Sequence, residues 1–156
     1  MARPDRRVRY TKAVLRQSLL ELMSDQPIEN ITVKELCRRA DVNRGTFYAH
    51  YASPHELLLS IENELYEEIA RSLDTNLTTE AISDLLINIF DLVEKNRDLC
   101  AVLFSEHGDK NFMRRIMFLA HDRSMQQWKA RYPQVDPAFM EKVYTFVVSG
   151  CLGLMQ

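Results

Sequence analysis

The segment "ITVKELCRRADVNRGTFYAHYASPHELL", from Ile31 to Leu58, contains the start signals of three successive helices. "TVKE" at Thr32 is a capping box, in which a threonine hydroxyl and a glutamate three residues later satisfy free backbone N–H groups. Asn43 is a suitable N-cap for a second helix, and "SPHE" begins a third with Ser53 as N-cap and Pro54 at the first helical position. The tight turn "ADVN" separates the first two helices. Two short helices joined by such a turn predict a helix-turn-helix.

The side chains of this segment divide into an apolar and a polar set. The apolar set can pack between the two short helices: Leu36, Ala40, Val42 and Phe47. The polar set would face outward from the second short helix: Arg44, Thr46, Tyr48 and His50. A helix end rich in hydrogen-bond donors can enter the DNA major groove, where each base pair shows a distinct edge. The alternative is a surface helix that meets only water, although aromatic residues such as Tyr48 and Tyr51 are unusual on such a face.

The rest of the chain is typical of an all-α protein. Glycine occurs only four times and proline five times, and apolar residues recur at intervals of three and four almost throughout, which is the helical period. The short helices are expected over Thr32–Ala40 and from Asn43 onward. We expect the other helices over these approximate ranges: Tyr10–Ser24, Ser53–Leu73, Thr79–Lys95, Arg97–Glu106, Asp109–Arg131, and Pro137 to the end.

Composition and charge restrict the class of protein. Hydrophobic residues make up 46% of the 156 residues and charged residues 27%, as in folded proteins. No apolar run approaches the roughly 20 residues that cross a membrane, and the basic N-terminus lacks the apolar core of a secretory signal. Residues 1–50 carry ten Lys/Arg against six Asp/Glu, a charge of +4, whereas residues 51–156 carry ten against sixteen, a charge of −6. A basic head indicates a polyanionic partner, but a chance imbalance on a solvated face would look the same.

Nothing in the sequence favours catalysis or metal binding. Cys37, Cys100 and Cys151 are far apart and within apolar patterns, which favours buried thiols in a reducing cytoplasm. No CxxC or HxxxH spacing indicates a metal site, and the Ser, His and Asp residues form no recognisable catalytic arrangement. We therefore expect a protein that is not an enzyme and needs no cofactor.

The segment from Ile31 to Leu58 resembles the DNA-binding region of the TetR family of bacterial transcriptional regulators. The matching residues are Thr32, Val33, Leu36, Ala40, Val42, Gly45, Thr46, Phe47, Tyr48 and His50, with Tyr51 in the aromatic place. The flanking helices extend the match to about residue 70. The resemblance implies an N-terminal three-helix helix-turn-helix DNA-binding domain, joined by a long fourth helix to a C-terminal helical dimerisation and ligand domain. We expect these domains over residues 1–52 and 53–156.

The resemblance implies contacts to the DNA backbone from three positions. Thr32 would bind a phosphate through its hydroxyl and backbone N–H at the start of its helix. Tyr48 would donate its hydroxyl to a phosphate, and His50 would contact the backbone at the helix end.

The resemblance also implies positions that read the bases. Arg44 is the best candidate for bidentate recognition of guanine, and Asn43 and Thr46 would face bases or phosphates beside it. Gly45 would let the DNA backbone come close where a side chain would block it.

Three positions depart from the family pattern. Cys37 stands where the family has a small alanine, which is a mild change. Asp41 stands at the turn glycine and tolerates a left-handed conformation less well. Pro54 stands where a lysine commonly binds a phosphate, and His55 is a weak substitute. The basic arm "RPDRRVRYTK" can compensate by offering cations to phosphates or to a narrow minor groove. Its candidate contacts are Arg6, Arg7 and Lys12.

The last segment, "PAFMEKVYTFVVSGCLGLMQ", is apolar on nearly all sides. Such a helix must be buried on more than one side, and a two-fold operator needs a dimer to present two heads. The candidate dimer-interface residues are Met140, Tyr144, Val147, Val148, Cys151 and Met155. Because the pattern runs to Gln156 without a cap or breaker, we expect the protein to continue beyond it.

Aromatic and methionine side chains in the C-terminal half suit an apolar or aromatic effector. The candidate pocket residues are Phe90, Phe104, Met113, Met117, His121, Trp128 and Tyr144. Such a stripe at helical spacing is more often plain core, and a residue like His121 is more often a surface or hydrogen-bonded side chain than a ligand group.

These inferences predict a sequence-specific DNA-binding regulator, in the role of a repressor, that binds a palindromic operator as a homodimer and is released by a small apolar effector. Such a protein would act in the bacterial cytoplasm at the nucleoid. The alternative is a helical protein-interaction module or co-activator whose DNA binding is weakened by the Pro54 change. Salt-dependent binding to duplex DNA separates these two functions.

Overall fold

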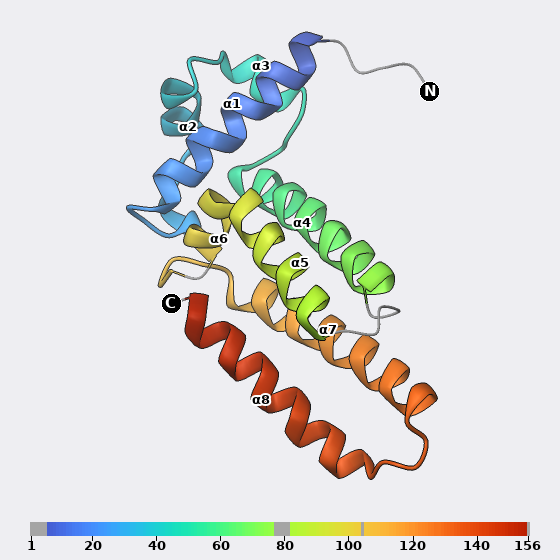
Figure 1. Cartoon of the computed structure of the whole chain (residues 1–156). Helices are drawn as coiled ribbons and strands as arrows, with labels where there is room; N and C mark the ends of the chain where they lie inside the picture. The colour runs from blue at the N-terminus through green and yellow to red at the C-terminus, as the bar shows by residue number, and fades with distance from the viewer. Residues whose placement is uncertain (1–5, 77–81, 104, 156) are drawn as a thin grey trace. The chain divides into compact units, whose positions relative to one another are not determined.

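The computed structural model describes residues 6–76, 82–103 and 105–155 of the chain. Within these residues it contains eight α-helices, one short 3-10 helix and no strand (Figure 1). The helices are α1 (Arg6–Met23), η1 (Ile28–Asn30), α2 (Val33–Arg39), α3 (Arg44–Tyr48), α4 (Pro54–Asn76), α5 (Ile82–Lys95), α6 (Arg97–Leu103), α7 (Lys110–Arg131) and α8 (Pro137–Met155). The all-α prediction is confirmed. No helix of the described part is long and apolar enough to cross a membrane.

The N-caps lie where the sequence predicts them. The Thr32 hydroxyl accepts a hydrogen bond from the backbone N–H of Glu35 at 3.2 Å, which begins α2. At α4 the Ser53 hydroxyl accepts from the N–H of Glu56, also at 3.2 Å. The Glu56 carboxylate accepts in return from the N–H of Ala52. These bonds satisfy N–H groups that have no partner inside the helix.

Within the described residues, helix ends differ from the expected bounds by three or more residues at three places, and the expected start at Thr79 lies outside the described residues. Helix α1 begins at Arg6, four residues before the expected start at Tyr10, because no breaker separates the two positions. Helix α4 continues to Asn76. Helix α6 ends at Leu103, where the hydroxyl of Ser105 donates to the carbonyl of Val102 at 2.7 Å and so competes with the helical pattern.

The chain divides into two compact units. The first, here called the head unit, comprises Met1–Leu65 and Arg97–Asp109. The second, the body unit, comprises Tyr66–Asn96 and Lys110–Gln156. Helix α4 contributes its first residues to the head and its last residues to the body. Helix α6, far along the sequence, belongs to the head.

The head unit is organised around α1, which packs against α2 and α6, while α2 packs against α3. Its most deeply buried side chains are Leu15, Leu19, Met23, Leu36, Phe47, Leu57 and Leu99. Burying each such side chain contributes about 1.5–3 kcal/mol. This shared core fixes the short helix α3 relative to α1, although a helix of that length has little stability of its own.

The body unit contains α7 and α8 side by side (Figure 1). A cluster of Met125, Met140 and Tyr144 is buried between them, and Trp128, Val135 and Val148 pack against it. The end of α4 is attached to α7 by polar contacts. Arg123 pairs with Asp74 at 3.3 Å, and the Arg115 guanidinium lies 4.9 Å from the centre of the Tyr66 ring.

Candidate nucleic-acid interface

Helix α3 buries one aromatic side chain and exposes its polar ones. Phe47 is 0% exposed, whereas Tyr48 is 58% exposed, and Arg44 and Thr46 are also exposed. The centre of the Phe47 ring lies 5.6 Å from the centre of the Tyr48 ring and 6.0 Å from the centre of the Tyr51 ring. The buried ring therefore anchors a helix whose other side chains are available for a partner.

The turn into α3 contains a residue in a left-handed conformation. Asp41 has φ 52°, a positive value that otherwise favours glycine. The N–H of Val42 donates to the carbonyl of Cys37 at 3.0 Å, which with Asp41 after the C-cap forms a Schellman motif. The turn therefore has the left-handed conformation that glycine usually adopts after a helix C-cap, here with an aspartate that adds a negative charge.

Thr32 combines a structural role with an exposed position. Its oxygen accepts the hydrogen bond from Glu35 at the start of α2, and its hydroxyl hydrogen is not used by that bond because a hydroxyl can donate and accept at once. Thr32 is exposed. It can cap α2 and still donate to an anion.

The basic arm is helical from Arg6 onward. Arg6 and Arg7 are exposed on the first turn of α1, and an α-helix with side chains is about 10–12 Å wide, whereas the minor groove is about 6 Å wide. The helix itself is therefore too wide to lie in a narrow minor groove, and contacts of these residues to phosphates or to the groove would be made by their side chains. Lys12 is exposed, and its Nζ lies 5.8 Å from the centre of the Tyr51 ring.

Two other arginines of the head are paired with carboxylates. Nε of Arg39 donates to Glu21 at 2.8 Å, and NH1 of Arg16 donates to Glu64 at 2.9 Å. The hydrogen bond from Arg39 holds the pKa of Glu21 below its usual value, with a smaller contribution from Gln17. These pairs reduce the positive charge that the N-terminal half offers to a polyanion.

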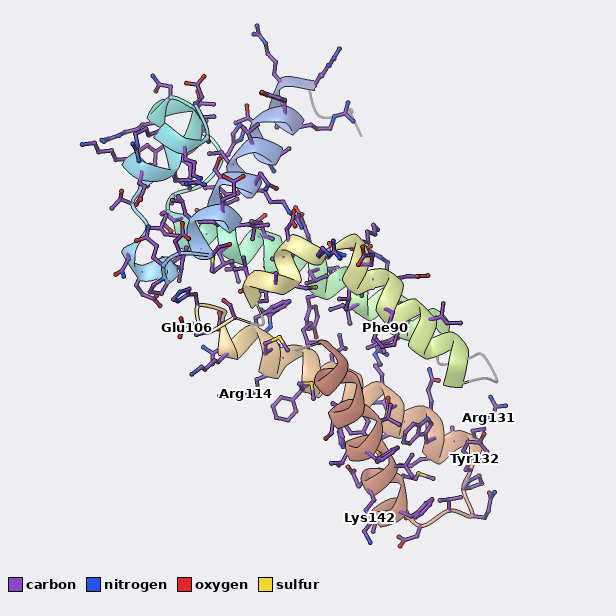
Figure 2. All side chains as sticks on the ribbon, turned by 60° about the vertical axis from the view of Figure 1, so that its left-hand side comes forward. Phe90, Glu106, Arg114, Arg131, Tyr132 and Lys142 are labelled. Atoms are coloured by element: carbon purple, nitrogen blue, oxygen red, sulfur yellow. The ribbon has the colours of Figure 1, made fainter. Side chains whose placement is uncertain are left out.

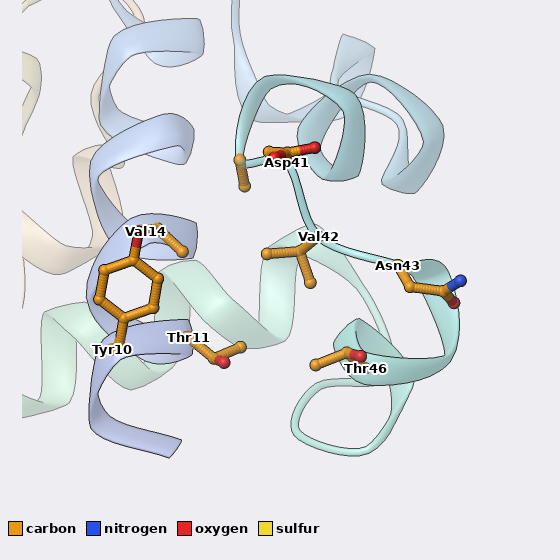
Figure 3. A pocket seen from close by; sticks show the side chains of 8 residues that line it. Tyr10, Thr11, Val14, Asp41, Val42, Asn43 and Thr46 are labelled. Atoms are coloured by element: carbon orange, nitrogen blue, oxygen red, sulfur yellow. The ribbon is translucent and has the colours of Figure 1, made fainter. Parts of the chain in front are cut away.

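All ten predicted DNA-contact residues lie in the head unit, nine of them exposed and His50 half-buried. Pro54, at the place of the family lysine, is buried at the start of α4, and the neighbouring His55 is exposed. Sequence reasoning did not identify a hollow of about 300 Å³ beside these residues, between α1 and the turn into α3 (Figure 3). The signal that could have pointed to it is Tyr10, an aromatic residue within the basic arm that is 70% exposed.

The predicted effector-pocket residues are distributed through the body unit. The Tyr144 hydroxyl donates to the carbonyl of Met117 at 3.1 Å. The His121 ring lies edge-on to that of Tyr144 at 4.9 Å, and His121 Nε2 lies 2.7 Å from the Glu141 carboxylate. These contacts belong to the packing of α7 on α8.

The other predicted pocket residues that the structure describes take no part in the contacts among Met117, His121 and Tyr144, and they differ in burial. Trp128 packs against the buried cluster of α7 and α8, and Met113 is half-buried. Phe90 on α5 is 39% exposed (labelled in Figure 2). Phe104 lies outside the described residues.

The predicted dimer residues on α8 fall into three groups. Met140 and Tyr144 are buried, at 4% and 9% exposure, in the cluster between α7 and α8 of the same chain. Val147 and Val148 are half-buried. The side chains of Cys151 and Met155 lie outside the described part of the structure.

Comparison with known proteins connects this geometry to a family. Residues 17–61 match the model of the bacterial regulatory proteins of the tetR family, and residues 80–156 match the C-terminal region of such transcriptional regulators. The uncharacterized HTH-type transcriptional regulator YvdT of Bacillus subtilis (strain 168) is 24% identical over 132 residues, which are 81% of this chain and 61% of that protein. A second one, YxbF of the same organism, is 35% identical over 66 residues, which are 42% of this chain and 17% of that protein.

The fold has solved counterparts. The structure of a transcriptional regulator from Aquifex aeolicus VF5 superposes with a TM-score of 0.73 at 18% identity, covering 93% of this chain and 84% of that one. This likeness supports the order of the helices over nearly the whole described chain. With the two family models matching the head and the C-terminal half, the chain belongs to the TetR family of bacterial transcriptional regulators.

Proposed function

We propose that this protein is a DNA-binding transcriptional regulator whose head unit recognises a site in duplex DNA through α3. The observation that carries the proposal is the arrangement of α3, where buried Phe47 fixes the helix and leaves Arg44, Thr46 and Tyr48 exposed. Arginine and threonine can bond to base edges in the major groove, and tyrosine to phosphates. The exposed arginines at the start of α1 add sequence-independent attraction for the backbone.

Binding-site selection from a random-sequence duplex pool tests this function directly. We expect one enriched sequence, and fluorescence anisotropy should show tighter binding to it than to a random duplex of equal length. The affinity should fall with salt in proportion to the number of phosphates contacted. Failure to bind any duplex at low salt would contradict the proposal and favour a protein-interaction module instead.

We further propose that the protein binds a palindromic operator as a homodimer, through the outer face of α8. Phe139 and Phe146 on α8 are 59% and 81% exposed, and Phe118 on α7 is 68% exposed. Phe139, Lys142 and Phe146 recur at helical spacing on one face, and Lys142 points away from the ribbon (Figure 2). Since exposed apolar groups of this size mark protein interfaces, and the opposite face is buried by α7, the outer face is the one available to a partner.

Sedimentation at micromolar concentration tests the dimer. We expect the unaltered chain to sediment as a dimer and Phe146→Ser to shift it toward the monomer. Leu59→Ser is the matched control, because Leu59 is 48% exposed on α4 in the head unit. A monomer for the unaltered chain, or equal effects of the two substitutions, would contradict an interface on α8.

We also propose that the protein is a repressor and that a small apolar effector releases it from DNA. These two parts of the proposal rest on the family resemblance. An effector bound at the candidate pocket residues would have to displace the contacts among Met117, His121 and Tyr144 within the body unit. Transcription in vitro from a promoter that overlaps the selected site distinguishes the roles, because a repressor lowers the transcript level and an activator raises it.

A further inference from the structure

The hollow in the head unit opens between α1 and the turn into α3. Its lining residues are Tyr10, Thr11, Val14, Ala40, Asp41, Val42, Asn43 and Thr46. Thr11 from α1 and Thr46 from α3 point toward one another across it (Figure 3). Because Asn43 and Thr46 belong to the helix start that is proposed to contact DNA, anything bound in the hollow lies at that interface.

The chemistry of the hollow is that of a site for a sugar–phosphate chain. Val14 and Val42 provide apolar surface, which suits the carbon atoms of a deoxyribose. The hydroxyls of Tyr10, Thr11 and Thr46 are neutral donors of the kind that bond to phosphate oxygens in protein–DNA complexes. The volume of about 300 Å³ is at the lower end of the range for small-molecule pockets.

The charges around the hollow favour an anion, with one exception. Arg9 directly precedes Tyr10 and Arg44 directly follows Asn43, and both arginines are exposed. Cations that adjoin the lining in this way favour a polyanion as the bound group. Asp41 is the one acidic residue of the lining. It is exposed and is held at the turn in the left-handed conformation.

We propose that this hollow receives a sugar–phosphate segment of bound DNA and that the charge of Asp41 weakens this contact, an inference that rests on the proposed DNA-binding function. Backbone contacts carry no sequence information. A repulsive carboxylate among them therefore lowers affinity for every sequence alike, and stable binding then requires the base contacts of α3. Because specificity is the difference between two affinities, a penalty shared by all sequences leaves the base preference unchanged, and Asp41 sets the absolute affinity of the head unit for DNA.

The first test concerns the hydroxyls. Thr11→Val removes a donor while keeping the shape of the side chain, and we expect about three- to ten-fold weaker binding to both the selected duplex and a random duplex. Thr11→Ser keeps the hydroxyl and should bind like the unaltered protein. The assignment of the hollow to DNA would be overturned if Thr11→Val bound both duplexes with unchanged affinity while its circular dichroism showed an intact helical fold.

The second test concerns the charge. Asp41→Asn and Asp41→Gly both remove the carboxylate and both tolerate a positive φ, so we expect both to bind random DNA about two- to five-fold more tightly. Asp25→Asn is the matched control, because it removes the same charge beyond the far end of α1, about 18 Å along the helix from Thr11. If only Asp41→Gly binds random DNA more tightly, the effect comes from the backbone and not from the carboxylate. If Asp25→Asn raises the affinity equally, the effect comes from the net charge of the protein. Either result contradicts the proposal.

The outcomes also separate this inference from the function on which it rests. If Arg44→Ala loses affinity for the selected duplex while the Thr11 and Asp41 variants behave like the unaltered protein, only the assignment of the hollow falls. If the unaltered protein binds no duplex of the pool, both fall.

Discussion

Oδ1 of Asn43 accepts a hydrogen bond from the backbone N–H of Gly45 at 2.7 Å, and this bond begins α3. A Cβ added to Gly45 would lie 3.3 Å from the same oxygen, closer than side chains normally approach. The glycine in the middle of a crowded polar segment is therefore explained in part by the cap. Without a Cβ, Gly45 lets the capping oxygen of Asn43 stay close to the amide and leaves the outer surface of α3 free of a side chain at this position.

We expect Gly45→Ala to change the free energy of unfolding by less than about 1 kcal/mol. Alanine is favoured over glycine in a helix by about 1 kcal/mol, but the tight contact with Asn43 weakens the cap and offsets this gain. DNA affinity should fall, because the new methyl group lies on the exposed side of α3. Urea denaturation and anisotropy measure the two effects separately. Lost DNA binding together with a large loss of stability would show instead that Gly45 serves only the fold.

Arg44→Ala should cost about 1–3 kcal/mol on the selected duplex and relax the base preference at one position. The expected cause is the loss of two hydrogen bonds to a guanine edge. Repeating the site selection with the variant shows which position has become permissive. Arg38→Ala, another exposed arginine of the head, is the control for charge alone. Equal losses on selected and random duplexes would make Arg44 a phosphate contact.

The sequence predicts the local structure of the head well because its signals are local. The N-caps at Thr32, Asn43 and Ser53 lie where the start signals place them, and Phe47 is buried as its apolar neighbours indicate. The left-handed conformation at Asp41 could not be read from its residue type, because glycine is the residue that usually occupies this position after a helix C-cap.

The sequence predicts the packing of the body unit less well, because that packing depends on contacts between helices and not on local signals. A helix that is apolar on nearly all sides, such as α8, does not reveal which side its own chain covers. Met140 and Tyr144 were predicted at a dimer interface, and they are buried by α7, whereas Phe146 faces outward. Only the position of the neighbouring helix decides between these two faces.

The Arg39–Glu21 pair predicts acid sensitivity of the head. Because the hydrogen bond from Arg39 lowers the pKa of Glu21, the stability from the pair is present above the ordinary glutamate pKa of about 4.3. It is lost as the pH falls through the lowered pKa. Glu21→Gln should therefore be less stable than the unaltered protein near neutral pH, and the difference should shrink on acidification. Urea midpoints between about pH 7 and pH 3 measure this.

The control for this pair is Glu29→Gln, which removes an exposed carboxylate from the short helix η1. We expect Glu29→Gln to lower the urea midpoint near pH 7 less than Glu21→Gln does, because Glu21 accepts the hydrogen bond from Arg39. A difference for Glu21→Gln that stays constant between about pH 7 and pH 3 would mean that the ionisation of Glu21 contributes nothing to stability.

The thiol of Cys100 should report on the opening of the head unit. Burial raises the pKa of Cys100 to about 11, so only about one thiol in a thousand is ionised at pH 8. Burial also raises the pKa of Cys37, against a smaller opposing effect of Arg44. We expect iodoacetamide to label both cysteines far more slowly in the folded protein than in urea, as read by mass spectrometry of peptides.

The two cysteines also test whether α6 opens together with the helix-turn-helix. Cys100 lies on α6, which packs on α1, and Cys37 lies on α2, which packs on α1 as well. If the head opens as one cooperative unit, the two labelling rates should rise in parallel with urea. Faster labelling of Cys100 with a weaker dependence on urea would show that α6 detaches while α1, α2 and α3 remain folded. That result would contradict a single cooperative head unit and restrict the stable core to the first three helices.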